Sequence, residues 1–210
     1  MNNEIYTKLN DILVWSNYYK ALCDKTDIYS GRSRIISVKD LVVLATEYAK
    51  KHGLNDKLAE LIVNSRELGF FPYGETGYNF IREKYEGFSQ ADCSIAILKN
   101  IIEEYNSMYN TELVIPEELI LGIECSFNKE YTPANSEGVM VCMVNDSYGL
   151  SRNISEKTLT AKEKGKRIED LDYAWNMNMS SCETTNENIA KNILKYTEAE
   201  LRGMGNFCEE

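Results

Sequence analysis

VKDLVVLATEYAKKHGLNDKLAELI, residues 38–62, is the stretch that decides the fold. Apolar side chains recur along it at helical spacing: Leu41, Leu44, Ala45 and Tyr48, then Leu58, Leu61 and Ile62. Gly53 is suited to end the first helix in the left-handed conformation, with Leu54 making the apolar contact that often follows. Asn55 is a favourable N-cap for the second helix. The stretch therefore predicts two helices, one ending at His52 and one beginning after Asn55.

The same periodicity extends over most of the chain. We expect an amphipathic helix over residues 1–23, turns over 24–37, a helix over about 90–105, a helix from Pro116 to Cys125, and a last helix from 184 or 185 to about 201. Residues 138–154 are apolar and suit a buried helix better than a strand, whereas 69–77 reads as an aromatic loop with glycine and proline. Residues 161–185 are polar and irregular. The sequence therefore predicts an all-α bundle of five to seven helices.

Length and composition favour one globular domain. The chain has 210 residues, of which 43% are apolar and 27% charged, with only 3 prolines. No apolar run reaches about 18 residues, and the first residues lack the features of a secretion signal, so we expect neither a membrane span nor export. The six cysteines form no CxxC pair, which is typical of reduced thiols in the cytoplasm. The net charge of −10 makes a nucleic-acid partner unexpected.

The small number of histidines limits the kinds of catalytic site that the chain can form. His52 is the single histidine of the chain, and it follows Lys50 and Lys51 near a predicted helix end, where a cap-proximal or solvent-facing role suits it. No GxSxG, P-loop or GxGxxG pattern is present. Histidine-dependent hydrolysis is therefore disfavoured, although a site built from carboxylates alone is not.

Five blocks in sequence order carry a family resemblance. They are Lys25-Thr26-Asp27-Ile28-Tyr29, Arg32-Ser33-Arg34-Ile35-Ile36-Ser37-Val38, Arg66-Glu67-Leu68-Gly69-Phe70-Phe71-Pro72-Tyr73-Gly74-Glu75, Gly87-Phe88-Ser89-Gln90-Ala91-Asp92-Cys93-Ser94 and Glu137-Gly138-Val139-Met140-Val141-Cys142-Met143-Val144-Asn145. Over residues 20–155 the chain thereby resembles the HD-domain deoxynucleoside triphosphohydrolases, often called dGTPases. The resemblance implies an HD-domain-like helical core over residues 1–160, an extension over 161–210 that packs on it, and a tendency to form homo-oligomers.

The departures from that family concern its metal ligands. The family holds its metal with a first histidine, a His-Asp pair and a late aspartate, which align here with Ser37, Arg66, Glu67 and Asn145. Further histidines near the leaving phosphates align with Phe70, Glu75 and Gln90. Of the four metal-site positions only Glu67 could still bind a cation, so we expect no metal and no other cofactor. We expect Arg66 to form an ion pair with Glu67 or Glu75 in the former metal position, because an unpaired buried carboxylate is costly.

The resemblance and the departures together predict a catalytically inactive pseudoenzyme with a regulatory or interaction role. A nucleotide or another phosphorylated small molecule could bind without hydrolysis, and a protein partner is the other expectation. Candidate phosphate- or nucleotide-binding residues are Lys25, Arg32, Arg34, Arg66 and Tyr73. The alternative is a metal-dependent nucleotide phosphohydrolase with a relocated carboxylate site, made for example from Glu67, Glu75 and Asp92.

Overall fold

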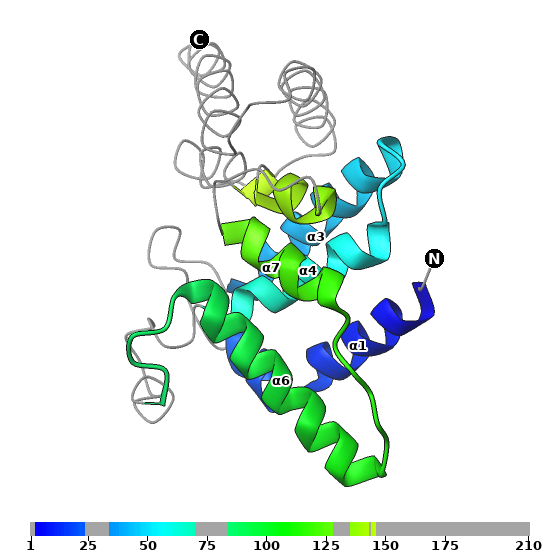
Figure 1. The fold of residues 1–210 in the computed structure, drawn as a ribbon. Helices are drawn as coiled ribbons and strands as arrows, with labels where there is room; N and C mark the ends of the chain where they lie inside the picture. Colours follow the sequence, from blue (N-terminus) through cyan, green and yellow to red (C-terminus); the bar gives the residue numbers. More distant parts are fainter. Residues whose placement is uncertain (1–2, 24–33, 70–83, 128–134, 143, 146–210) are drawn as a thin grey trace.

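Helices form all the regular structure that is described. The computed structural model describes residues 3–23, 34–69, 84–127, 135–142 and 144–145, and within these ranges no strand occurs. The helices are α1 (Asn3–Trp15), α2 (Asn17–Cys23), α3 (Arg34–Lys51), α4 (Asp56–Leu68), α6 (Gln90–Tyr109) and α7 (Glu117–Phe127), and residues 136–142 and 144–145 are also helical (Figure 1). The predicted all-α class and the helical choice for the apolar stretch after residue 138 are confirmed for these residues.

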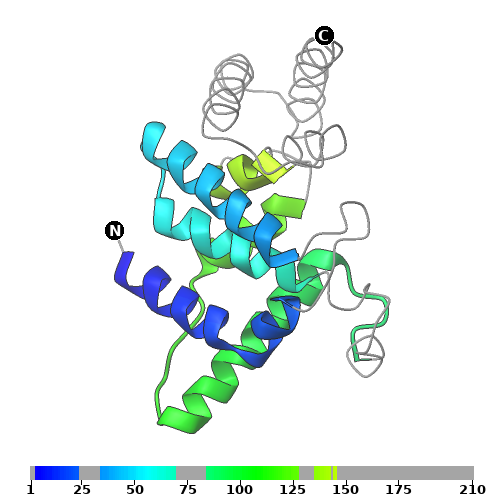
Figure 2. The same ribbon diagram turned by 180° about the vertical axis from the view of Figure 1, so that it is seen from behind.

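Helix α4 is the axis of the bundle. It packs against α1, α3, α6 and α7, and both views place it between α3 and α1 (Figures 1 and 2). Every side chain from Leu61 to Leu68 is buried. The largest fully buried side chains come from α4 itself and from the four helices packed against it: Leu9, Leu13, Leu44, Tyr48, Leu61, Ile62, Leu68, Ile97, Leu98 and Leu119. Because these apolar side chains leave water together, they supply the main driving force for folding.

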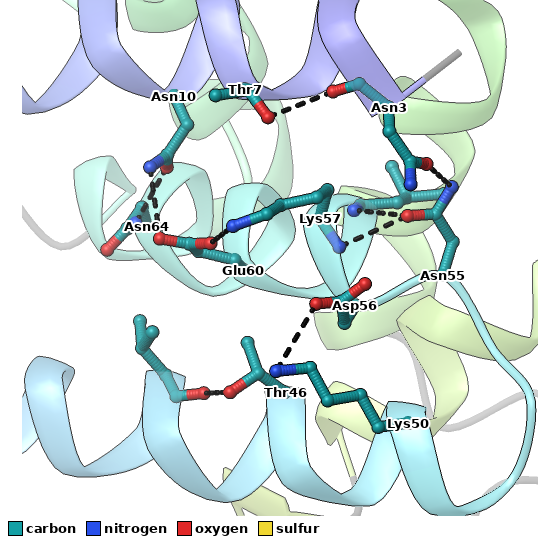
Figure 3. A network of polar contacts seen from close by, with 12 residues as sticks. Asn3, Thr7, Asn10, Thr46, Lys50, Asn55, Asp56, Lys57, Glu60 and Asn64 are labelled. Carbon is teal, nitrogen blue, oxygen red and sulfur yellow. Dashed lines mark hydrogen bonds and ion pairs between the residues drawn. The ribbon is translucent and has the colours of Figure 1, made fainter. Parts of the chain in front are cut away.

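The turn between α3 and α4 has the predicted geometry. Gly53 adopts a φ of 67°, and the Leu54 amide donates to the Ala49 carbonyl at 2.8 Å. The Asn55 side chain accepts hydrogen bonds from the next amides, those of Lys57 and Leu58, both at 3.1 Å (Figure 3). This short connection makes α3 and α4 an antiparallel pair, so the start of α3 lies at the same end as the close of α4.

The prediction of one helix over residues 1–23 is wrong. The chain breaks at Ser16, whose hydroxyl oxygen accepts a hydrogen bond from the Tyr19 amide at 3.1 Å and so begins α2. A hydroxyl that bonds the backbone locally competes with helix continuation, which apolar periodicity does not reveal.

Other boundaries differ from the prediction by about one turn. Helix α3 begins at Arg34, so the last four residues of the expected turn region over 24–37 are helical. Helix α6 continues past Tyr105 to Tyr109 and stops at Asn110, which has a φ of 51°. Pro116 precedes α7, and its carbonyl accepts from the Leu119 amide at 3.1 Å.

Glycine allows the helical residues 136–142 to lie very close to α7. A Cβ atom on Gly138 would stand 2.5 Å from the Gly122 carbonyl oxygen and 2.8 Å from the Cys125 Cβ. At the N-terminal end of this stretch, the Glu137 carboxylate accepts from the Asn55 amide at 2.9 Å. The stretch is therefore fixed to both α7 and the start of α4.

Among the described helices, none is long and apolar enough to cross a membrane. The expected domain limit near residue 160, the extension over 161–210 and its last helix lie outside the described residues.

Candidate functional site

Four consecutive polar residues lie buried in the last turns of the central helix. We call Asn64, Ser65, Arg66 and Glu67 the polar turn; their exposed fractions are 3%, 0%, 7% and 3%. Burying polar or charged groups costs free energy unless partners replace water. The polar turn contains two of the four positions aligned with metal ligands, so it is the candidate site.

The guanidinium of Arg66 faces the end of α7. Its Nη1 donates to the Ser126 carbonyl at 3.2 Å, and its Cζ lies 4.5 Å from the centroid of the Phe127 ring. The last carbonyls of a helix lack intrahelical donors and carry partial negative charge. Arg66 therefore serves as an internal cation at the C-terminal end of α7, with an aromatic face beneath it.

This contact only partly matches the expectation for Arg66. Its burial agrees with a charge held inside the bundle rather than in solvent. The expected partner Glu75 lies outside the described residues, and the pair with Glu67 stays a prediction. The partner on α7 was not foreseen, because only the tertiary fold brings residues 66 and 126 together.

A chain of amides and a phenol occupies the side of the polar turn toward α1 and α2. The Tyr19 hydroxyl donates to Asn64 Oδ1 at 2.7 Å, and Asn64 Nδ2 donates to Asn10 Oδ1 at 2.8 Å. Asn10 in turn donates to the Glu60 carboxylate at 3.3 Å, which also pairs with Lys57 at 3.1 Å (Figure 3). These contacts join three helices, and no local pattern in the sequence predicts them.

The N-terminal part of helix α6 packs against the C-terminal end of α4. The Ser94 hydroxyl donates to the Arg66 carbonyl at 3.0 Å. A Cβ atom on Gly69 would stand 2.1 Å from the Gln90 carbonyl oxygen, so the two backbones are in direct contact there. The fold thus brings the backbone of Gln90, one of the positions aligned with a histidine, next to the polar turn.

The two remaining metal-site positions are less fully defined. Ser37 stands in the first turns of α3, and antiparallel pairing places its backbone at the same end of the hairpin as Glu67. Its side chain lies outside what the structure describes. Asn145 is half-buried and is the last described residue of the helical stretch after residue 135.

The donor set of the four positions does not fit a divalent metal. A guanidinium remains protonated and cannot be a ligand, and serine and asparagine are weak donors beside a single carboxylate. No group of three or more His, Cys, Asp or Glu side chains in the described ranges could hold a metal ion. The chemistry of the residues thus disagrees with the metal that the family resemblance implies.

Asp92 and His52, two further residues with ligand chemistry, are engaged elsewhere. The exposed Asp92 carboxylate accepts from the Ser89 amide at 3.2 Å, and the Asp92 amide donates to the Ser89 hydroxyl oxygen at 3.1 Å, which forms a capping box at the start of α6. His52 follows α3 at the other end of the hairpin from Glu67, with its ring centroid 4.3 Å from that of Tyr48. It is partly buried rather than solvent-facing. Burial and then the neighbouring Lys51 lower the pKa of His52.

Among the candidate phosphate-binding residues, Arg66 is the one whose side chain belongs to the described part of the chain. Lys25, Arg32 and Tyr73 lie outside the described residues, as do Phe70 and Glu75. Arg34 opens α3, and its side chain is outside the description too. The side chain of Arg66 is described, and the carbonyl of Ser126 already engages it.

Comparison with known proteins gives a consistent but distant likeness. No family model matches the chain. The deoxyguanosinetriphosphate triphosphohydrolase-like proteins of Rickettsia typhi (strain ATCC VR-144 / Wilmington) and Rickettsia prowazekii (strain Madrid E) are 23% and 24% identical to it. These matches cover 78% and 77% of this chain but 50% and 48% of the relatives. A protein of the same description from Pelagibacter ubique (strain HTCC1062) is 28% identical over 44% of the chain and 26% of its own length. The resemblance to dGTPase-like proteins is thus confirmed, and the chain spans about half the length of the first two relatives.

Proposed function

We propose that this chain is a catalytically inactive, dGTPase-like pseudoenzyme with a regulatory or interaction role. The observation that carries the proposal is the burial of Arg66 at a position that the motifs align with a metal-binding histidine. Its guanidinium is bonded to the end of α7 and lies over an aromatic ring. A permanent cation at this aligned position would repel the metal ion that a hydrolase of this kind needs.

The magnitude of the charge effect supports inactivity. A divalent ion about 5 Å from a guanidinium, at an effective dielectric constant of about 20, is repelled by roughly 7 kcal/mol. Glu67 is the one carboxylate among the four aligned positions, and it offers little to offset that repulsion. Without a bound metal to lower the pKa of a water molecule, hydrolysis by that route has no nucleophile at neutral pH.

Ligand binding is a separate part of the proposal. Lys25, Arg32 and Arg34 supply positive charge, and Tyr73 supplies an aromatic face on which a base could stack. The Arg66 guanidinium already donates a hydrogen bond within the bundle. It therefore favours an anionic ligand through its positive electrostatic potential rather than through a direct contact with that ligand. A nucleotide or a related phosphorylated molecule is the ligand class that these side chains suit.

An activity assay tests inactivity. Purified protein is incubated with dGTP and Mn²⁺ or Mg²⁺, and release of tripolyphosphate is measured beside the Glu67→Ala variant. We expect equal background rates for the two proteins. Metal-dependent release that Glu67→Ala abolishes would overturn the proposal in favour of the relocated carboxylate site.

A thermal-shift series tests the ligand. Deoxynucleotides and ribonucleotides are titrated with and without Mn²⁺, since a ligand that binds only the native state raises the melting temperature. We expect a metal-independent rise that an Arg32→Ala, Arg34→Ala double variant loses. If no nucleotide changes the melting temperature, the nucleotide-binding part of the proposal is wrong. The interaction role then calls for a protein partner, which affinity capture with the wild-type chain would identify.

A further inference from the structure

The charges of the polar turn bear on the form in which a nucleotide can bind. A nucleoside triphosphate exists in solution both free and with a divalent ion on its phosphate oxygens. A site that takes the metal-bound form shares the ion between those oxygens and its own side chains, usually one or two carboxylates. The side chains around the ligand therefore decide which of the two forms is bound.

The polar turn gives a divalent ion little to bind. Glu67 is its single carboxylate, and no group of three or more His, Cys, Asp or Glu side chains in the described ranges could hold an ion. Arg66 is the next residue, and it is 7% exposed beside the 3% of Glu67. Their opposite charges cancel for an approaching ion, so the polar turn exerts no net attraction on it.

The Arg66 side chain is held in place from several directions. Its Nη1 donates to the buried Ser126 carbonyl at 3.2 Å, and its Cζ lies 4.5 Å from the centroid of the Phe127 ring. Its own carbonyl accepts from the Ser94 hydroxyl at 3.0 Å. Turning the guanidinium away would leave a buried carbonyl without its donor, which is costly. Arg66 therefore does not make room for a metal ion by moving aside.

The same end of the bundle suits phosphate oxygens that carry no metal. Arg34 begins α3 and Arg66 lies in the last turn of α4, at the same end of this antiparallel pair (Figures 1 and 2). Guanidinium groups pair with phosphate oxygens through two parallel hydrogen bonds. A chelated ion would occupy those oxygens and bring further positive charge toward the arginines.

We infer that this chain binds the metal-free form of a nucleotide and excludes the form that carries a divalent ion. The inference rests on the nucleotide-binding part of the proposed function and specifies the form of its ligand. A divalent ion then competes with the protein for the phosphates and does not bridge the two. Stabilisation by a nucleotide needs no metal, and added metal reduces it.

Calorimetric titration of the full chain with dGTP tests the inference. Titrations are run in EDTA and at several Mg²⁺ concentrations, with ionic strength held constant. The apparent dissociation constant should rise in inverse proportion to the metal-free fraction of dGTP, about tenfold when about a tenth is metal-free. An unchanged or lower constant in Mg²⁺ would overturn the inference and leave nucleotide binding intact. If dGTP binds in neither condition, the nucleotide-binding part of the proposed function is wrong as well.

Substitutions at Arg66 test whether its charge excludes the metal. Arg66→Gln leaves the Glu67 carboxylate to attract the ion, so the apparent dissociation constant should rise less over the same Mg²⁺ series. Arg66→Lys retains the charge and should retain the full rise. Lys84→Gln, which removes a positive charge from an exposed lysine beside Tyr85, should match the wild type. Circular dichroism checks that each variant folds. A full rise in Arg66→Gln would contradict the role given to Arg66.

Discussion

At the scale of single residues, Arg66 links the polar turn to the end of α7. Arg66→Met keeps an unbranched apolar stem and removes both the hydrogen bond to the Ser126 carbonyl and the cation–π contact with Phe127. We expect the free energy of unfolding to fall by about 2 kcal/mol, because a buried carbonyl loses its donor. Urea denaturation measures the loss.

The exposed Lys84 offers the control for Arg66. Its ammonium lies 5.4 Å from the Tyr85 ring centroid, and an exposed contact of this kind contributes under about 1 kcal/mol. Lys84→Met should therefore cost clearly less than Arg66→Met. Equal losses for the two variants would contradict the role assigned to the buried guanidinium.

Gly69 makes a second prediction at this scale. In Gly69→Ala the new Cβ would stand 2.1 Å from the Gln90 carbonyl oxygen and 2.5 Å from Ser94 Oγ, so α6 must move away from α4. We expect a loss of about 2–3 kcal/mol, as for overpacking. In Gly87→Ala the space is open but the φ is 82°, so backbone strain alone should cost about 1 kcal/mol. The reverse order in urea denaturation would contradict the close contact of α4 with α6.

The lowered pKa of His52 determines in which direction the folding stability changes with pH. Burial, with Lys51 beside it, lowers the pKa of His52 below its ordinary 6.5, so protonation favours the unfolded chain. The stability that neutral His52 supplies is present above about pH 6.5 and is lost as the pH falls below that value. His52→Gln should flatten the dependence of stability on pH in this window. Unfolding curves at several pH values test this, and unchanged slopes would refute it.

At the scale of helices, the N-terminal caps of α4 and α6 can be compared by their contributions to stability. Asn55→Ala removes the acceptor for two amides at the start of α4 and also the bond to the Asn3 side chain at 3.0 Å (Figure 3). We expect a loss of about 1–2 kcal/mol. Ser89→Ala removes the capping box of α6 and should cost about 1 kcal/mol. A greater loss for Ser89→Ala in denaturant titrations would contradict the larger part given to Asn55.

Hydrophobic periodicity predicts the buried faces of the helices but not the residues at which the helices end. The apolar stripes of α3, α4 and α6 were predicted because their residues recur at the helical period and face one core. The break at Ser16 was missed, since a single hydroxyl bond to a nearby amide leaves the apolar pattern intact. Helix ends therefore depend on local bonds that composition and periodicity describe poorly.

At the scale of the whole molecule, α4 should be the most protected element. It packs against four other helices, and its side chains from Leu61 onward are buried. Amides in such a helix exchange only when the whole bundle opens. Hydrogen exchange followed by mass spectrometry should therefore find slower exchange in Leu61–Leu68 than in α1. Faster exchange in α4 than in α1 would contradict its central place.

The sequence by itself determined the helical class, the turn at Gly53 and Asn55, and the resemblance to dGTPase-like proteins, because each depends on neighbouring residues or on motif order. It also placed Arg66 at a position that the motifs align with a histidine of those proteins. The tertiary structure decided what surrounds Arg66: the Ser126 carbonyl, the Phe127 ring and the Ser94 hydroxyl come from α7 and α6. Contacts between residues far apart in the chain depend on how helices pack, and a single sequence does not encode that packing in any local pattern.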